Sequence, residues 1–112
     1  MSRDPHKLEA FVLADELVVD VYRQTSRFPP AERFGLQSQV RRAAVSVAAN
    51  LVEGSARQSE REYVHFISIA IGSASEARYL TSLAVRLGMM DERAAQQLGH
   101  RYGRVSGRSR PS

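Results

Sequence analysis

The sequence of 112 residues contains no cysteine, a single lysine and few aromatic residues. Without cysteine the chain can form neither a disulfide nor a thiolate metal site, which favours a reducing compartment. No apolar run is long enough to cross a bilayer, and the charged first residues lack the pattern of a secretory signal. We therefore expect one cytoplasmic domain with no membrane partner.

The net charge of +4 is distributed unevenly along the chain. Five arginines and no acidic residue follow Glu92, whereas residues 1–92 hold 11 basic and 12 acidic side chains. A near-neutral body with a basic end is a weaker indication of nucleic-acid binding than a uniformly basic domain. Tyr102 is the only aromatic residue near that end, so an ordinary solvated tail remains an alternative.

Apolar residues recur at helical spacing through most of the chain, and no segment alternates like a strand. Ser59 and Asp91 have the chemistry of N-caps, and Gly54 and Gly88 that of helix C-terminal stops. The expected helices span approximately residues 6–25, 36–53, 59–87 and 91–105. Four helices with short connections predict an all-α, antiparallel up-down-up-down four-helix bundle over 1–105 with a short fourth helix, followed by a basic flexible tail at 106–112.

The segment from Phe34 to Gly54 is predicted to be a helix with two apolar sides separated by polar residues. The inward side comprises Leu36, Val40, Ala43, Val47 and Leu51. The polar stripe comprises Gln39, Arg42, Ser46, Asn50 and Glu53. The second apolar side comprises Val45, Ala48, Ala49 and Val52.

The second apolar side has two interpretations. It is either an interface with another subunit or is covered by the fourth helix of the same bundle. We favour the interface, because the fourth helix is short and contains Gly99 and Gly103.

The polar stripe also has two interpretations. Asn50, Glu53 and Glu76 could perform acid–base chemistry, or they could belong to a structural network that fixes the helix register. We favour the network, because no nucleophile and base with an orienting third group are evident. Its predicted members are Gln39, Ser46, Asn50, Glu53, Ser73 and Glu76.

Glu62 and His65 form the Glu-x-x-His spacing of di-iron helical bundles, but such a site needs two of these motifs and two further glutamates. Glu62 is better explained as the partner of Ser59 in a capping box. We therefore expect no metal, no cofactor and no catalytic residue. The candidate phosphate-binding residues are Arg41, Arg42, Arg57 and Arg61.

Several motifs together resemble the bacterial four-helix-bundle proteins also called 23S rRNA intervening-sequence proteins. They are FP-x-x-E at 28–32, GL-x-SQ at 35–39, RRAAVSVAAN at 41–50, EG at 53–54, EYV-x-F at 62–66, IA-x-GSASE at 69–76 and LG-M at 87–89. The resemblance implies a left-handed bundle that assembles into a homo-oligomer, typically a pentamer. It implies no enzymatic activity. It also suggests a relation to the accessory variability protein of diversity-generating retroelements, which works with a reverse transcriptase and nucleic acid.

The resemblance weakens near Tyr102, where relatives continue a long amphipathic helix and this chain continues GRVSGRSRPS. Two hypotheses of function follow. The first is a non-enzymatic homo-oligomer, pentameric by resemblance, that associates with RNA or with an RNA-processing or reverse-transcriptase partner. The alternative is a protein–protein interaction scaffold with no nucleic-acid role.

Overall fold

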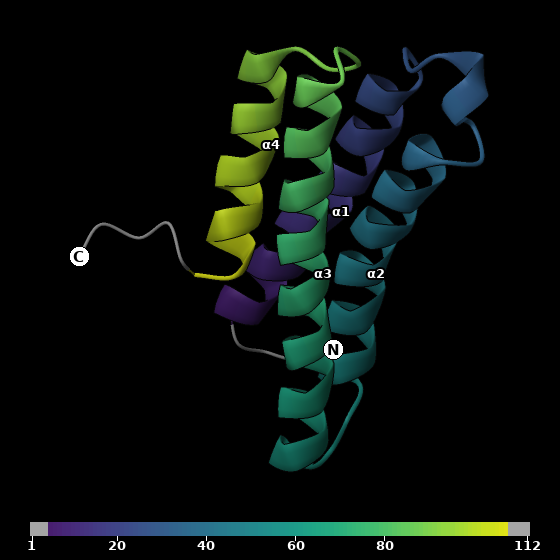
Figure 1. The fold of residues 1–112 in the computed structure, drawn as a ribbon. Coiled ribbons are helices and arrows are strands. Elements are labelled where there is room, and N and C mark those ends of the chain that lie inside the picture. The colour runs from purple at the N-terminus through teal and green to yellow at the C-terminus, as the bar shows by residue number, and fades with distance from the viewer. Residues whose placement is uncertain (1–4, 108–112) are drawn as a thin grey trace.

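A computed structural model describes residues 5–107. They form four α-helices and one 3₁₀ turn, joined by short connections (Figure 1). In chain order they are α1 (Pro5–Thr25), η1 (Pro30–Glu32), α2 (Leu36–Ser55), α3 (Glu60–Arg86) and α4 (Glu92–Val105). These residues contain no strand, so the expected all-helical class is confirmed. No helix among them combines the length and apolarity needed to span a membrane. The predicted tail at 106–112 lies outside the described residues from position 108 onward.

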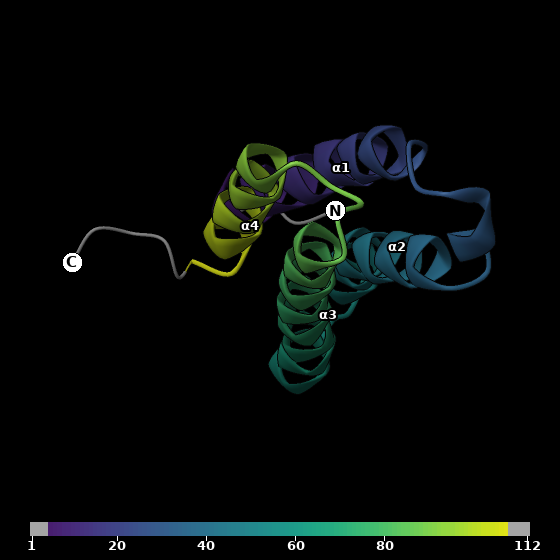
Figure 2. The same cartoon turned by 45° about the horizontal axis from the view of Figure 1, so that its top comes forward.

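Each helix packs against two others, in the order α1–α2, α2–α3, α3–α4 and α4–α1. The packing between α2 and α3 is the most extensive, and the backbones of the diagonal pairs do not approach each other, although Lys7 of α1 reaches the Tyr63 ring of α3 at 3.8 Å. The connections after α1 and after α3 lie at one end of the molecule, and the connection after α2 lies at the other (Figure 1). This arrangement around a shared core, seen obliquely in Figure 2, is consistent with a four-helix bundle.

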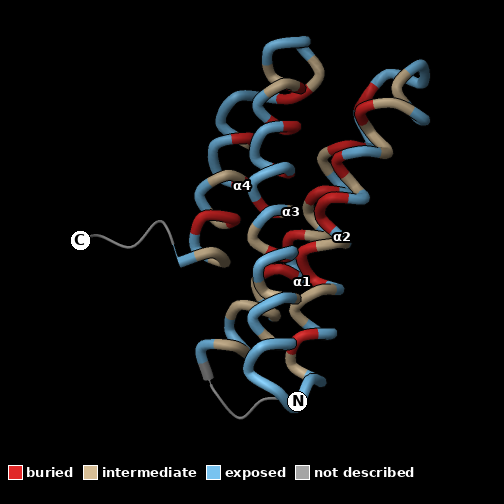
Figure 3. Tube along the Cα trace, turned by 60° about the horizontal axis from the view of Figure 1, so that its bottom comes forward, coloured by how far each residue is buried: buried red, intermediate tan, exposed pale blue. Residues whose placement is uncertain are grey.

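The core is rich in alanine, which allows the helices to approach closely. Buried residues form stripes along the inner sides of the helices (Figure 3). Nine of the nineteen buried hydrophobic residues are alanines: Ala14, Ala43, Ala44, Ala48, Ala70, Ala74, Ala77, Ala84 and Ala95. Tyr102, at the end of α4, is the largest fully buried side chain.

The predicted helix ends are confirmed where side-chain chemistry determines them. The Ser59 hydroxyl accepts a hydrogen bond from the Glu62 backbone N–H at 3.1 Å, and the Asp91 carboxylate accepts one from Ala94 N–H at 3.1 Å. Gly88 follows α3 with a φ of 75°, a left-handed conformation that glycine adopts without steric cost.

The prediction that Gly54 ends α2 is wrong. The helix continues to Ser55, and Gly54 is buried within its last turn. A Cβ atom added at Gly54 would lie 3.2 Å from the Cβ of Phe66 and 3.4 Å from the Cδ1 of Ile67. Glycine is therefore needed here because α3 passes directly over it.

Tyr102 places a polar atom in this apolar core. Its side chain is fully buried, and its hydroxyl has no hydrogen-bond partner among the described residues. Burial raises the pKa of the Tyr102 phenol well above its usual value, because the phenolate would lose its hydration.

We expect Gly54→Leu to lower the free energy of unfolding by about 1–3 kcal/mol, because the new side chain has no space beneath α3. Gly72→Ala is the matched control. It lies within α3, nothing is within 4 Å of the Cβ atom that the substitution adds, and helix propensity alone should raise stability by about 0.5–1 kcal/mol. Urea titration of both variants tests this prediction, and equal effects would contradict it.

We expect Tyr102→Phe to stabilise the fold by about 1 kcal/mol, because it removes a buried hydroxyl that has no partner among the described residues. In the unfolded chain this phenol ionises near pH ~10, whereas in the folded chain it stays protonated to higher pH. Wild-type stability should therefore fall as pH rises above about 10, with this group contributing up to about 1.4 kcal/mol per pH unit. Urea titrations at pH 8 and 11, at one protein concentration, should show a smaller loss for the variant.

Candidate functional site

A short chain of hydrogen bonds joins α2 to α3 along the predicted polar stripe. The hydroxyls of Ser46 and Ser73 lie 2.7 Å apart. The Asn50 amide donates to the Ser46 carbonyl at 2.8 Å and to its hydroxyl at 3.1 Å. These three half-buried residues satisfy one another across the most extensive helix interface of the fold. Their hydrogen bonds link half of the six residues expected in the network.

Two of the remaining three, Gln39 and Glu76, line a shallow groove of about 490 Å³ beside Ser46. Arg42 lies on the wall of the same groove. Arg42 and Glu76 form no ion pair in the described part of the chain. The structure brings opposite charges to one groove and leaves both exposed to solvent.

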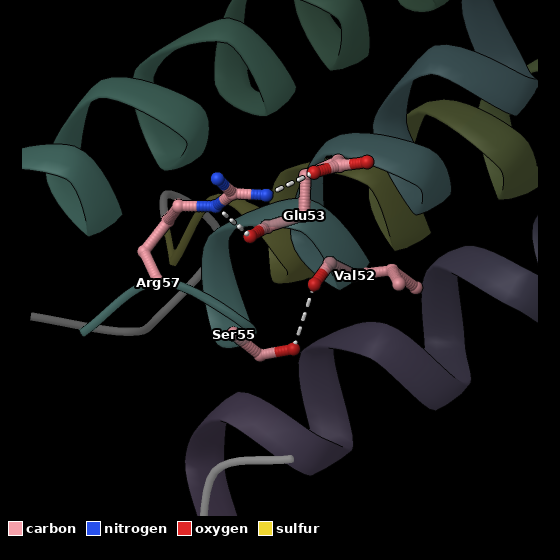
Figure 4. Close-up of polar contacts among 4 residues, drawn as sticks. All are labelled: Val52, Glu53, Ser55 and Arg57. Atoms are coloured by element: carbon pink, nitrogen blue, oxygen red, sulfur yellow. Dashed lines mark hydrogen bonds and ion pairs between the residues drawn. The ribbon is translucent and has the colours of Figure 1, made fainter.

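Glu53, the last of the six, is engaged elsewhere. Its carboxylate accepts a hydrogen bond from the Arg57 guanidinium at 2.6 Å, and its backbone carbonyl accepts a second from Arg57 Nε at 3.1 Å (Figure 4). In the same view the Ser55 hydroxyl donates to the Val52 carbonyl. Arginine therefore closes the C-terminal end of α2, where positive charge is favourable.

The geometry of the stripe provides no catalytic arrangement. Within residues 5–107 the Ser46 and Ser73 hydroxyls bond to each other, and the Ser46 hydroxyl also accepts from Asn50. Neither hydroxyl bonds to a histidine or carboxylate that could act as a base. The Ser59 hydroxyl donates to the Glu62 carboxylate at 3.2 Å and accepts from the Glu62 backbone N–H, so Glu62 is engaged at the start of α3. No group of three or more His, Asp or Glu side chains in these residues is placed to hold a metal ion.

The four arginines predicted to contact phosphate have different surroundings. Arg57 is paired with Glu53, and its guanidinium lies 5.1 Å from the Phe66 ring centre. Arg42 and Arg61 are exposed and form no ion pair with another described residue. Arg41 is held at the opposite end of α2 from Arg57.

Arg41 closes the C-terminal end of α1. Its Nε donates to the buried Thr25 hydroxyl at 2.9 Å, and its second amine donates to the Tyr22 carbonyl at 3.2 Å. The guanidinium also lies 4.3 Å from the Tyr22 ring centre. Gln37 donates to the Thr25 carbonyl at 2.8 Å. These side chains of α2 add hydrogen bonds to the Tyr22 and Thr25 carbonyls, which also accept from backbone N–H groups of the following turn, and they place a cation at the negative end of the helix dipole.

The sequence pattern did not predict this junction. Thr25 ends α1, whereas Gln37 and Arg41 are in α2, so the participants are distant in sequence. The available signal was a threonine in the last turn of a predicted helix, followed by a short breaker and an arginine in the next helix. Such a signal is too common to identify a particular pair.

The second apolar side of α2 is divided by the structure. Ala48 lies in the core with 9% of its surface exposed, whereas Ala49 is exposed and Val45 and Val52 are each 43% exposed. The interpretation that the fourth helix covers this side gains no support, because the α2 and α4 backbones lie diagonally across the core and do not approach each other.

An exposed apolar stripe on α1 accompanies the one on α2. It comprises Leu8, Val12, Val19 and Tyr22, which recur at helical spacing. Arg41 of α2 contacts Tyr22 of α1 and lies one turn before Val45. The Tyr22 end of the α1 stripe therefore lies close to α2, whereas Leu8 and Val12 line a groove with Arg104 and Val105 at the end of α4.

We expect Arg41→Gln to lower the free energy of unfolding by about 1–2 kcal/mol, because it removes charge-assisted hydrogen bonds and leaves the buried Thr25 hydroxyl with one partner fewer. The neighbouring Arg42→Gln, exposed and without an ion pair to a described residue, should change it by less than about 0.5 kcal/mol. Thermal and urea unfolding of the two variants provide the comparison. Equal losses would show that Arg41 has no special role at this junction.

A solved structure has a similar fold. The structure is similar to the crystal structure of a protein of unknown function from the S23 ribosomal protein family of Bacteroides thetaiotaomicron VPI-5482, with a TM-score of 0.83 and 17% sequence identity. The alignment covers 93% of this chain and 94% of that one, which shows a shared fold. No curated protein matches the sequence. The family model of the 23S rRNA-intervening sequence proteins matches residues 6–108, and the chain therefore belongs to the 23S rRNA-intervening sequence protein family.

Proposed function

We propose that this chain is a non-enzymatic, self-associating left-handed up-down-up-down bundle that acts in the cytoplasm by binding RNA. The exposed apolar side of α2 is the observation on which this proposal rests. Val45 and Val52 expose 43% of their surface each, with the small Ala49 between them. Contiguous apolar side chains on a helical face are costly in water unless another surface covers them.

A second copy of the chain is the partner that fits this face. The neighbouring stripe of α1 widens the apolar area, and the small side chain of Ala49 allows another helix to approach closely. Head-to-tail contact between the α2 side of one copy and the α1 stripe of the next would give a ring, and the pentamer expected from the family resemblance is the assembly we propose.

Association with RNA is supported by charge. Arg42 and Arg61 are exposed and not neutralised by an ion pair with a described residue. A ring repeats each such group around its axis and strengthens the local positive potential. The proposed partner is RNA itself or an RNA-processing or reverse-transcriptase protein bound to it.

Light scattering of wild-type protein and Ala49→Glu tests the assembly. Ala49 is exposed, so a glutamate there can be solvated in the monomer but would be buried without a partner charge at the interface. We expect wild type to elute as an oligomer and the variant as a smaller species with unchanged helical content. Ser68→Glu, at an exposed position of α3, controls for the added charge and should keep the wild-type mass. The same mass for wild type and Ala49→Glu would contradict the proposed interface.

The RNA role is tested separately, by titrating structured and single-stranded RNA at low and moderate salt. The proposal is supported if the logarithm of the binding constant falls linearly with the logarithm of salt concentration. A protein that assembles but binds no RNA at low salt, and retains a specific protein partner after nuclease treatment, would favour the scaffold alternative.

A further inference from the structure

A groove of about 520 Å³ runs between α3 and α4, and its charged residues are predominantly basic. Arg78 and Arg86 of α3 lie on one wall, and His100 of α4 lies on the other. Glu92 is the only acidic residue of the lining. From Arg78 to Gly107 the chain carries five arginines and two acidic residues, so this side of the molecule is positive.

The arginines of the groove are not neutralised within the described chain. Arg78 and Arg86 form no ion pair there, in contrast to Arg101, whose guanidinium lies 2.7 Å from the Asp20 carboxylate of α1. A smaller hollow of about 290 Å³ on α4 shares Gln96 and His100 with the groove and adds Arg93. The positive surface therefore continues from the groove over the outer side of α4.

The Arg78 side chain reaches α4 at Gly99. A Cβ atom at Gly99 would lie 3.9 Å from Arg78 Nε, so this part of the arginine lies beside the α4 backbone. Arg78 is exposed and lines the groove together with Gly99.

An aromatic ring lies beside these charges. Tyr79 is 58% exposed, and the Arg86 guanidinium lies 6.0 Å from its ring centre. Tyr79, Ser82 and Arg86 occupy positions i, i+3 and i+7 of α3, which share one side of a helix. An exposed ring next to a basic groove is the combination that single-stranded nucleic acid requires, because bases stack on the ring while arginines contact phosphates.

We propose that the α3–α4 groove binds single-stranded RNA, with Arg78 and Arg86 on successive phosphates and Tyr79 stacked on an unpaired base. Ser82 and Gln96 line the same groove, and their side chains form no hydrogen bond with another described residue. These side chains can therefore bond to ribose 2′-hydroxyls. This inference rests on the proposed RNA association and changes its location, from Arg42 of α2 and Arg61 at the start of α3 to the groove between α3 and α4.

The position of the groove is compatible with assembly. Viewed obliquely in Figure 2, α3 and α4 lie side by side, and α1 with α2 occupies the other side of the core. Subunits that associate through α1 and α2 leave the α3–α4 groove open on each copy.

The test measures anisotropy of a fluorescently labelled 20-nucleotide oligouridylate over a range of salt concentrations. Arg78→Gln/Arg86→Gln should weaken binding about tenfold or more at low salt and reduce the slope of log affinity against log salt by about 1.4, the value for two single-strand phosphate contacts. The control Arg23→Gln/Arg27→Gln removes two charges from exposed sites at the end of α1 and should change affinity less than about threefold. Circular dichroism and light scattering verify that each variant folds and assembles as wild type does.

Tyr79 provides a second, charge-independent measurement. Tyr79→Ala should weaken binding about tenfold without changing the salt slope, and Tyr79→Phe should restore it, because stacking needs the ring and not the hydroxyl. An oligothymidylate of the same length should bind more weakly than the RNA, and equal or tighter binding would overturn the assignment to RNA.

Two results separate this inference from the proposed function. If wild type binds RNA and the groove variants bind equally well, while Arg42→Gln/Arg61→Gln binds weakly, the groove assignment is overturned and the RNA association stands. If wild type binds no RNA at low salt, both fail, whatever its oligomeric state.

Discussion

The close approach of α2 and α3 is the constraint on which the rest of the structure depends. Alanines make up half of the buried hydrophobic side chains of α2 and most of those of α3, and Gly54 allows Phe66 and Ile67 to lie directly on the α2 backbone. Close packing gains dispersion energy but buries little apolar area per residue, so such a core contributes less hydrophobic stabilisation than one built of leucines. Several larger apolar side chains of α1 and α2 face solvent instead of joining this core.

Polar side chains near the start and in the middle of α2 fix how α2 and α3 pack in the bundle. Arg41 connects α2 to the end of α1, and Ser46 with Asn50 connects it to Ser73 of α3. Hydrogen bonds of this kind contribute modest net stability but penalise a shifted register strongly, because a shift leaves half-buried hydroxyls without partners. The register in turn determines that Val45 and Val52 face outward.

Sequence reasoning succeeded where the signal is local. Ser59 and Asp91 cap their helices through backbone groups three residues away, so a short stretch of sequence contains all participants. Gly54 was misassigned because a glycine that ends a helix and a glycine beneath a crossing helix look identical in sequence. The α1–α2 junction and the α3–α4 groove escaped notice for a related reason. Their residues come from separate helices, and counting arginines along the chain does not reveal which ones share a side.

The two proposed surfaces respond differently to solution conditions, which has a consequence for how they act together. Association through apolar side chains is weakened little by salt, whereas phosphate contacts weaken steeply. In the proposed assembly the two surfaces would lie on different sides of each bundle, so the grooves would be multiplied without being covered, and an RNA long enough to reach a second groove would bind it at high effective concentration. Linkage would then require the reverse effect as well. An RNA that spanned two subunits would bind the assembled form more tightly than the separate one, and it would therefore stabilise the proposed apolar contact without touching it.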